Sequence, residues 1–142
     1  MHILAKKLVV EFIDAFFLVF AIGISSGDLA PFAITGVLIA MIFAGAHISG
    51  AHYNPAVTVS LFLRGSAPVR EVFPYGLAIG FVIFGGMILV GPVSGAVFNP
   101  AVAAGLFVRS ATDLSMLGLY TAASLAGGVA AAFVFLFTKG EK

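Results

Sequence analysis

Two asparagines, Asn54 and Asn99, carry the clearest chemistry in the sequence, because each stands at the same place in a repeated motif. Residues 49–57 read Ser-Gly-Ala-His-Tyr-Asn-Pro-Ala-Val, and residues 94–102 read Ser-Gly-Ala-Val-Phe-Asn-Pro-Ala-Val. Continued to residue 109, the two copies share ten identities over sixteen aligned positions, which indicates an internal repeat. The side-chain amides can donate hydrogen bonds to the oxygen of a small molecule such as water.

Catalysis is the weaker interpretation of the same region. His52 with Ser49 or Ser94 has side chains that a hydrolase could use, but no acid lies nearby to orient the histidine as a triad requires. The histidines at positions 2, 47 and 52 show no metal-ligand spacing, and the absence of cysteine excludes disulfides and thiolate chemistry. We therefore expect no enzyme activity, no cofactor and no metal site.

The composition indicates an integral membrane protein. The chain has 142 residues, of which 61% are hydrophobic and 9% charged, and its mean hydropathy is +1.18. A soluble domain has about 25% charged residues, so this chain lacks the polar surface to face water and its main partner is a lipid bilayer. A net charge of +1 without a basic cluster argues against nucleic acid. Because the first apolar run, from residue 8 to 24, has spanning length, we expect no cleavable signal peptide.

The apolar runs predict four spans within one transmembrane domain over residues 1–142. The spans cover about residues 8–26, 30–46, 71–90 and 114–137, with the third broken by Gly91-Pro92. The glycine-rich and polar stretch from residue 45 to 53 is expected to be a re-entrant loop, because non-helical backbone needs protein or water around it at membrane depth. A second such loop is expected from residue 93.

A half-helix follows each loop, over about residues 55–64 and 100–109. Asn54 and Asn99 are strong N-caps, and the proline after each has no N–H to leave unsatisfied. About ten residues are half a span, so each half-helix is expected to return to the side from which it entered. The chain is thus predicted to be an all-α membrane protein with four transmembrane helices and two re-entrant half-helices.

Two carboxylates lie inside the first span. Asp14 is expected near the interface, where a carboxylate close to a helix N-terminus can reach water. For Glu11 we leave two interpretations open, the same interfacial one and a bundle-facing one in which its carboxylate accepts backbone hydrogen bonds from irregular chain. A carboxylate in a spanning segment is costly and usually has a partner.

The topology brings the two motifs together. With both termini in the cytoplasm, six of the seven basic residues lie inside, and Arg109 alone is outside. Half-helices that enter from opposite faces meet at the midplane with their positive N-termini, which makes a barrier to cations and protons. The loops before them would offer backbone carbonyls as acceptors, from Gly50, Ala51, His52 and Tyr53 and from Gly95, Ala96, Val97 and Phe98.

These residues resemble the aquaporin family of water and glycerol channels, also called major intrinsic proteins. The resemblance rests on the two Asn-Pro-Ala loops and extends to Glu11-Phe12, His47-Ile48 and Gly127-Gly128, so that it covers nearly the whole chain. It implies a fold of two inverted repeats, a homotetramer in the cell (plasma or inner) membrane, and a loop-bracing role for Glu11. It assigns the central pore to Asn54, Pro55, Ala56, Asn99, Pro100 and Ala101.

The resemblance also implies an outer constriction, which by spacing falls on Ile34, Met87, Ala96 and Val102. Water-selective members usually have an arginine directly after the second Asn-Pro-Ala, and a histidine is common at the second of these four positions. Here all four residues are apolar. A constriction without a charged donor favours small neutral solutes by size, so a broader small-solute pore is as well supported as a water-selective one.

The sequence departs from the family in length. Family members have six spans, and only 42 residues separate Ala56 from Asn99, which is room for one span where the family has three. Residues 67–74 resemble the start of the family's third span and residues 80–91 the end of its fifth, which indicates a deletion that fused them. We therefore expect a passive channel for water and small neutral solutes such as glycerol, with a non-conducting, truncated membrane protein or scaffold as the alternative.

Overall fold

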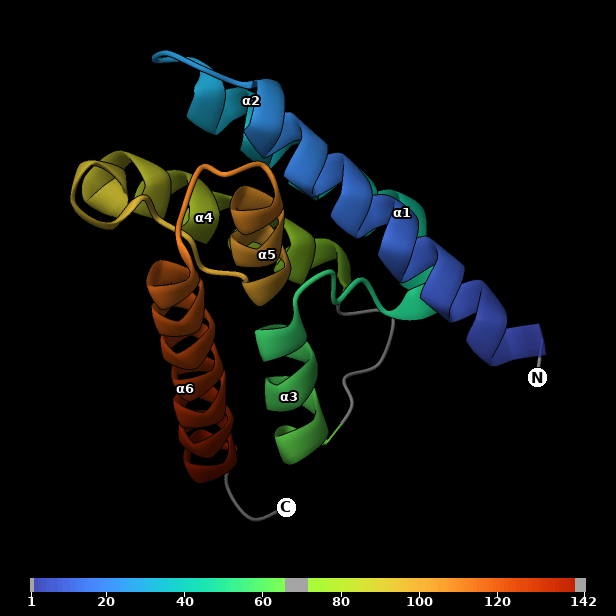
Figure 1. The fold of residues 1–142 in the computed structure, drawn as a ribbon. Coiled ribbons are helices and arrows are strands. Elements are labelled where there is room, and N and C mark those ends of the chain that lie inside the picture. The colour runs from blue at the N-terminus through green and yellow to red at the C-terminus, as the bar shows by residue number, and fades with distance from the viewer. Residues whose placement is uncertain (1, 66–71, 140–142) are drawn as a thin grey trace. The chain divides into compact units, whose positions relative to one another are not determined.

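The computed structural model describes residues 2–65 and 72–139, which form six helices and the turns between them (Figure 1). None of the described residues lies in a β-strand. The predicted link at residues 66–70 and the predicted start of the third span at residue 71 lie outside the described residues, as do residues 1 and 140–142. The helices are α1 (His2–Ile24), α2 (Ala30–Ser49), α3 (Pro55–Arg64), α4 (Val72–Ser94), α5 (Pro100–Val108) and α6 (Leu114–Thr138).

The chain divides into two compact units, and it passes from one to the other inside both copies of the repeated motif. Unit 1 holds residues 1–53 and 68–97, and unit 2 holds residues 54–67 and 98–142. In the first copy the division falls just before Asn54, and in the second it falls one residue before Asn99. Both loops therefore lie in unit 1, except for Phe98, and both Asn-Pro-Ala segments lie in unit 2.

In unit 1, α2 packs against both α1 and α4. Glycines allow these close contacts, because small residues let helix backbones approach each other in a membrane. A Cβ atom placed on Gly76 of α4 would lie 2.9 Å from Cγ2 of Ile42, and one placed on Gly80 would collide with Ile39. On another face of α2, Gly45 lies against side chains of α1. Gly76 and Gly80 of α4 thus act in packing, whereas a Cβ atom on Gly85 or Gly91 would have nothing within 4 Å.

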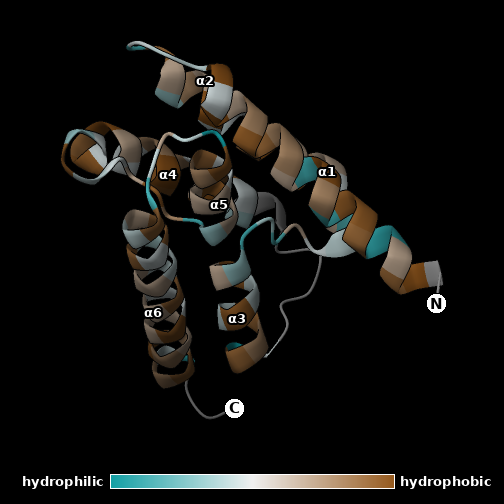
Figure 2. Cartoon of the chain, in the orientation of Figure 1, coloured by the Kyte–Doolittle hydropathy of each residue, from teal (hydrophilic) through white to brown (hydrophobic). Residues whose placement is uncertain are grey.

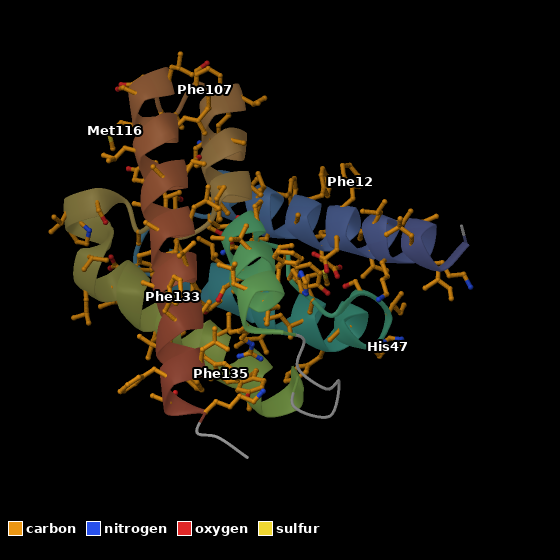
Figure 3. The ribbon with its side chains drawn as sticks, turned by 90° about the horizontal axis from the view of Figure 1, so that it is seen from below. Phe12, His47, Phe107, Met116, Phe133 and Phe135 are labelled. Atoms are coloured by element: carbon orange, nitrogen blue, oxygen red, sulfur yellow. The ribbon has the colours of Figure 1, made fainter. Side chains whose placement is uncertain are left out.

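In unit 2, both half-helices pack on α6 and also contact each other (Figure 1). Gly128 of α6 lies so close to the start of α3 that an added Cβ atom would be 2.6 Å from the carbonyl oxygen of Ala56. Near the other end of α3, the guanidinium carbon of Arg64 lies 4.2 Å from the ring centroid of Phe135. Figure 3 labels this phenylalanine on α6.

A side-chain cap starts α6. The Asp113 carboxylate accepts hydrogen bonds from the Ser115 hydroxyl at 2.6 Å and from the backbone N–H of Met116 at 2.8 Å. These bonds stabilise the ionised form, so they hold the pKa of Asp113 below its ordinary value, with the hydroxyl bond as the larger cause. The helix therefore begins with an anionic N-cap outside its apolar stretch.

The helices are predominantly hydrophobic, with hydrophilic residues in the loops and at a few positions of α1 (Figure 2). Among the described residues, α2, residues 75–94 of α4, and α6 are long and apolar enough to cross a membrane. Helix α1 does not meet this criterion, because every 18-residue stretch of it contains at least three charged residues. Large apolar side chains such as Phe12, which points away from α1 in Figure 3, are exposed to the surroundings. The protein is an all-helical integral membrane protein.

Two predicted helix ends are wrong. The second span was expected to end at Ala46, but α2 continues to Ser49, because Gly45 is tolerated inside the helix and the left-handed residue that stops it is Gly50. Gly91-Pro92 was expected to break the third span, but α4 continues through it to Ser94. Pro92 removes one backbone hydrogen bond only three residues before Gly95 ends the helix, which limits the disruption.

Candidate functional site

The two loops are shorter than expected and have matching geometry. Each has four residues, Gly50–Tyr53 and Gly95–Phe98, and each begins with a glycine and an alanine at positive φ. The φ values are +100° and +56° in the first loop and +73° and +51° in the second. In each loop the N–H of the alanine donates to the hydroxyl of the serine two residues before it, at 3.0 and 3.4 Å. The sequence repeat is therefore also a repeat of local backbone structure.

Asparagine side chains cap both half-helices. The Oδ1 atom of Asn54 accepts from the N–H of Ala56 at 2.9 Å, and Oδ1 of Asn99 accepts from the N–H of Ala101 at the same distance. Pro55 and Pro100 occupy the first helical turn, where a missing N–H costs nothing. Because Oδ1 is used by the cap in both copies, the amide Nδ2 is the atom oriented toward other acceptors.

One hydrogen bond connects the two copies inside unit 2. Nδ2 of Asn54 donates to the carbonyl oxygen of Phe98 at 3.0 Å. Phe98 directly precedes the cap of α5, so this bond joins the start of one half-helix to the start of the other. The structure thus brings the N-terminal ends of α3 and α5 together, where the positive ends of their dipoles and their remaining N–H donors lie close to each other.

Glu11 holds the first loop. Its Oε1 accepts from the N–H of His52 at 3.0 Å, and its Oε2 accepts from the N–H of Tyr53 at 2.7 Å. Hydrogen bonds to a charged acceptor are short and strong, so both contacts fix the loop backbone to α1. Among the hydrogen bonds of the described residues, none reaches the backbone N–H of Val97 or Phe98, the corresponding positions of the second loop. The two loops therefore differ in their support.

Asp14 is covered by protein, so the expectation that its carboxylate reaches water is wrong. The residue is 5% exposed, and its Oδ2 atom is buried without a hydrogen-bond partner in the described structure. It lies against Gly45 of α2, beside the hydroxyl of Tyr53. Distance along the helix from its N-terminus suggested access to water, but the close approach of α2 at a glycine covers this face of α1. The sequence signal that could have found it is a small residue opposite an acidic one.

The four residues of the expected constriction belong to different units. Ile34 on α2, Met87 on α4 and Ala96 in the second loop lie in unit 1, and Val102 on α5 lies in unit 2. Ile34 and Val102 are buried, and Met87 and Ala96 are partly exposed. In the two loops, Gly50, Gly95 and Phe98 are exposed. The other loop residues are buried or partly exposed. The constriction remains a prediction.

The chemistry available here is hydrogen bonding without charge transfer. Among the described residues, no three acidic, histidine or cysteine side chains gather in a way that could hold a metal ion. The polar groups at the two helix starts are amides and backbone N–H and C=O groups, which can replace the hydrogen bonds of a neutral polar molecule. A passing cation would meet two positive helix ends instead.

Comparison with known proteins agrees with this arrangement. The family model described as major intrinsic protein matches residues 2–78 and 74–142. The chain is 37% identical over 83 residues to Aquaporin NIP1-4 of Oryza sativa, covering 51% of this chain and 30% of the relative. It is 34% identical over 102 residues to Aquaporin Z of Photorhabdus laumondii, covering 60% and 43%. The chain thus spans about a third of the length of the relatives it matches. No solved structure matches it significantly.

The junction of the two family-model matches is informative. They meet at residues 74–78, in the first turns of α4. The sequence indicates that the start of the family's third span runs into the end of its fifth within this same helix.

Proposed function

The chain belongs to the major intrinsic protein family, and on this premise we propose that it forms a passive transmembrane channel for water and small neutral solutes. The observation that carries the proposal is the meeting of two Asn-capped half-helices in unit 2, joined by the hydrogen bond from Asn54 to Phe98. Aligned helix N-termini with free donors are suited to neutral oxygen-containing molecules and repel cations.

In this proposal the two asparagines are the central donors, and the loop carbonyls are the acceptors along the path. The loops from Gly50 to Tyr53 and from Gly95 to Phe98 each contain consecutive residues at positive φ. The loop carbonyls are outside the helices and can face a path for solute, although the carbonyl of Phe98 already accepts from Asn54. Glu11 has a structural role, because it holds the first loop in this conformation through two hydrogen bonds.

Selectivity is proposed to rest on size. The four positions assigned to the constriction, Ile34, Met87, Ala96 and Val102, carry no charge and no side-chain hydrogen-bond donor. A solute that passes them loses hydrogen bonds to water without full replacement, which disfavours ions strongly and small neutral molecules much less. Glycerol and urea are therefore proposed substrates together with water.

The remaining features of the proposal concern the membrane. We place α1 as a fourth span, because Glu11 has its partners within the protein and Lys6 and Lys7 precede the apolar stretch. Both termini then lie on the cytoplasmic side of the cell membrane, and most basic residues lie on the same side. With fewer spans than its relatives, the chain would need neighbouring copies to shield its loops from lipid, and a homotetramer is the assembly expected from the family.

The test is osmotic shrinkage of proteoliposomes followed by light scattering, with water, glycerol and urea as separate solutes. Wild-type rates should exceed those of protein-free vesicles for at least one of the three. Asn54→Asp and Asn99→Asp keep an oxygen for the cap and remove the amide donor, so each should lower the flux while the helices remain. Rates equal to those of empty vesicles for all three solutes would reject the proposal.

A second candidate function has a specific observation in its favour. Only 42 residues separate Ala56 from Asn99, so two spans that wall part of a family pore are expected to be missing between the motifs. A non-conducting membrane protein or scaffold would need no such wall. It predicts that well-folded protein in vesicles gives no flux above background, and that Asn54→Asp changes nothing that the assay measures.

A further inference from the structure

A second carboxyl group lies beneath the first loop, and the proposed pore does not use it. Asp14 lies one helical turn after Glu11 on α1 and is 5% exposed. Its Oδ2 atom and the Tyr53 hydroxyl both lie against Gly45, where an added Cβ atom would collide with each of them. Tyr53 is itself 3% exposed and belongs to the loop.

The hydrogen bonds around the two carboxyl groups assign them different states. Both oxygens of Glu11 accept from backbone N–H groups, which is the pattern of an ionised carboxylate. Oδ2 of Asp14 is buried without a backbone donor, and the Tyr53 hydroxyl is the side-chain group that can hydrogen-bond to this carboxyl. A second ionised carboxylate one turn from the first, without a backbone donor, would be costly at membrane depth. Two nearby carboxyls with such unequal surroundings are expected to differ in protonation.

The Tyr53 hydroxyl is placed to complete the arrangement. It donates to the carbonyl oxygen of Met41 at 3.1 Å, so the oxygen next to Asp14 retains its lone pairs as acceptors. While the hydroxyl hydrogen is given to Met41, the Tyr53 oxygen and the Asp14 carboxyl can hydrogen-bond to each other only through a second hydrogen. A proton on Asp14 supplies it and gives a chain from Asp14 through Tyr53 to the backbone of α2.

The backbone shows why the first loop needs such a tie. Tyr53 has a φ of +46°, which is strained for a residue with a side chain. The corresponding residue of the second loop is Phe98, which has no hydroxyl and is not among the non-glycine residues at positive φ. The arrangement therefore belongs to the first loop alone and does not follow from the repeat.

We propose that Asp14 holds a proton in the folded protein and, through the Tyr53 hydroxyl, positions the first loop. Loss of this proton would place a second negative charge beside Glu11 and would draw the Tyr53 hydrogen from Met41 to Asp14. The loop would then lose one of its ties to α2. Asp14 is thus a positioning residue, and the inference that it affects solute flux rests on the proposed channel function.

Among the residues that the structure describes, no other titratable group faces Asp14. The titratable side chains that interact with it are those of Glu11, on the same helix, and Tyr53, on the loop. From α2, which packs against α1, the titratable residue is His47, and its side chain is exposed. Lys6 and Lys7 lie two turns away and are also exposed.

Thermal unfolding as a function of pH tests the bound proton without reference to transport. Above about pH 4 an unfolded aspartate is ionised, so a folded state that retains the proton loses about tenfold in its folding equilibrium constant per pH unit. Wild type should therefore become less stable than Asp14→Asn as the pH rises from about 5 to about 8. Asp28→Asn, which changes an exposed carboxylate, should follow wild type. Parallel curves for wild type and Asp14→Asn would overturn the proposal.

Infrared spectroscopy of the wild type gives a second measurement, in case Asp14→Asn does not fold. Near neutral pH the spectrum should contain the carbonyl stretch of a protonated carboxylic acid, which Asp28→Asn retains and which disappears at alkaline pH. A spectrum with ionised carboxylates alone would overturn the proposal.

Flux measured at about pH 6 and about pH 9 then tests the consequence for the loop. Wild type should conduct less at the higher pH, and Asp14→Asn should conduct equally at both. Flux that is absent at every pH, with the proton linkage intact, would reject the channel function and leave the proton site standing. Intact flux with parallel stability curves would reject the proton site and leave the channel function standing.

Discussion

Gly128→Ala is expected to separate α6 from the start of α3, and its neighbour offers a matched control. A Cβ atom on Gly128 would lie 2.6 Å from the carbonyl oxygen of Ala56 and 3.3 Å from its carbonyl carbon. Both atoms belong to the backbone, so no side-chain rotation can relieve the contact and the two helices must move apart. Forcing an extra methyl group into such a contact costs about 1–3 kcal/mol.

The control is Gly127→Ala, because a Cβ atom on Gly127 would have nothing within 4 Å. Both substitutions favour the helix by about 0.8–1 kcal/mol, so this gain cancels when the variants are compared with each other. Gly128→Ala should therefore be less stable than Gly127→Ala by about 1–3 kcal/mol, which is the cost of the contact itself. Thermal unfolding of the two purified proteins in detergent, followed by circular dichroism, measures this difference.

Equal unfolding temperatures for the two variants would refute the reasoning, because they would mean that α6 does not lie against the Asn-Pro-Ala segment of α3 at this glycine. A loss of stability in Gly127→Ala as large as that in Gly128→Ala would have the same meaning. If the channel function holds, Gly128→Ala should also lower solute flux, since the displaced segment carries Asn54.

Three further changes have expected outcomes. Glu11→Gln leaves one of two loop N–H groups without an acceptor and should cost about 1–3 kcal/mol in thermal unfolding; an unchanged melting temperature would contradict the bracing role. Asn54→Ala removes both the cap and the bond to Phe98 and should destabilise the protein by about 1 kcal/mol or more, with Asn54→Asp recovering the part due to the cap in the same assay. Because the pKa of Asp113 is lowered in the folded protein, its ionised form stabilises the fold at pH values above the ordinary aspartate pKa, and this stability is lost as the pH falls through the lowered pKa. Asp113→Asn can still cap the helix, so its thermal stability should lack this loss between about pH 5 and about pH 2.

The sequence was sufficient for features that depend on local rules. The Asn-Pro pair predicts a helix start wherever it occurs, and both half-helices begin at the proline. The bundle-facing interpretation of Glu11 rested on the cost of a carboxylate in a span, and the structure shows this carboxylate accepting two backbone hydrogen bonds. These inferences needed only residue type and position in the chain.

Features that depend on a neighbouring helix were missed. Asp14 was assigned to the interface because its position along α1 was visible and the approach of Gly45 was not. Glycine and proline were also interpreted as helix breakers at residues 45 and 91–92, although α2 and α4 continue through these positions. The helix ends are set instead by Gly50 and Gly95, whose positive φ values cannot be recognised among many glycines from sequence alone.

The packing of α3 on α6 has a consequence for the biosynthesis of the chain. The two helices are partners within unit 2, yet α6 begins at residue 114, long after α3 has ended at residue 64. At about 5–20 residues per second, a ribosome needs several seconds to produce the intervening segment and the helix itself. During that interval α3, with its ten residues, is too short to cross the bilayer and lacks its main packing partner in unit 2. A nascent chain stalled before residue 114 should therefore expose α3 to proteases or insertion chaperones, and completion of α6 should end that exposure.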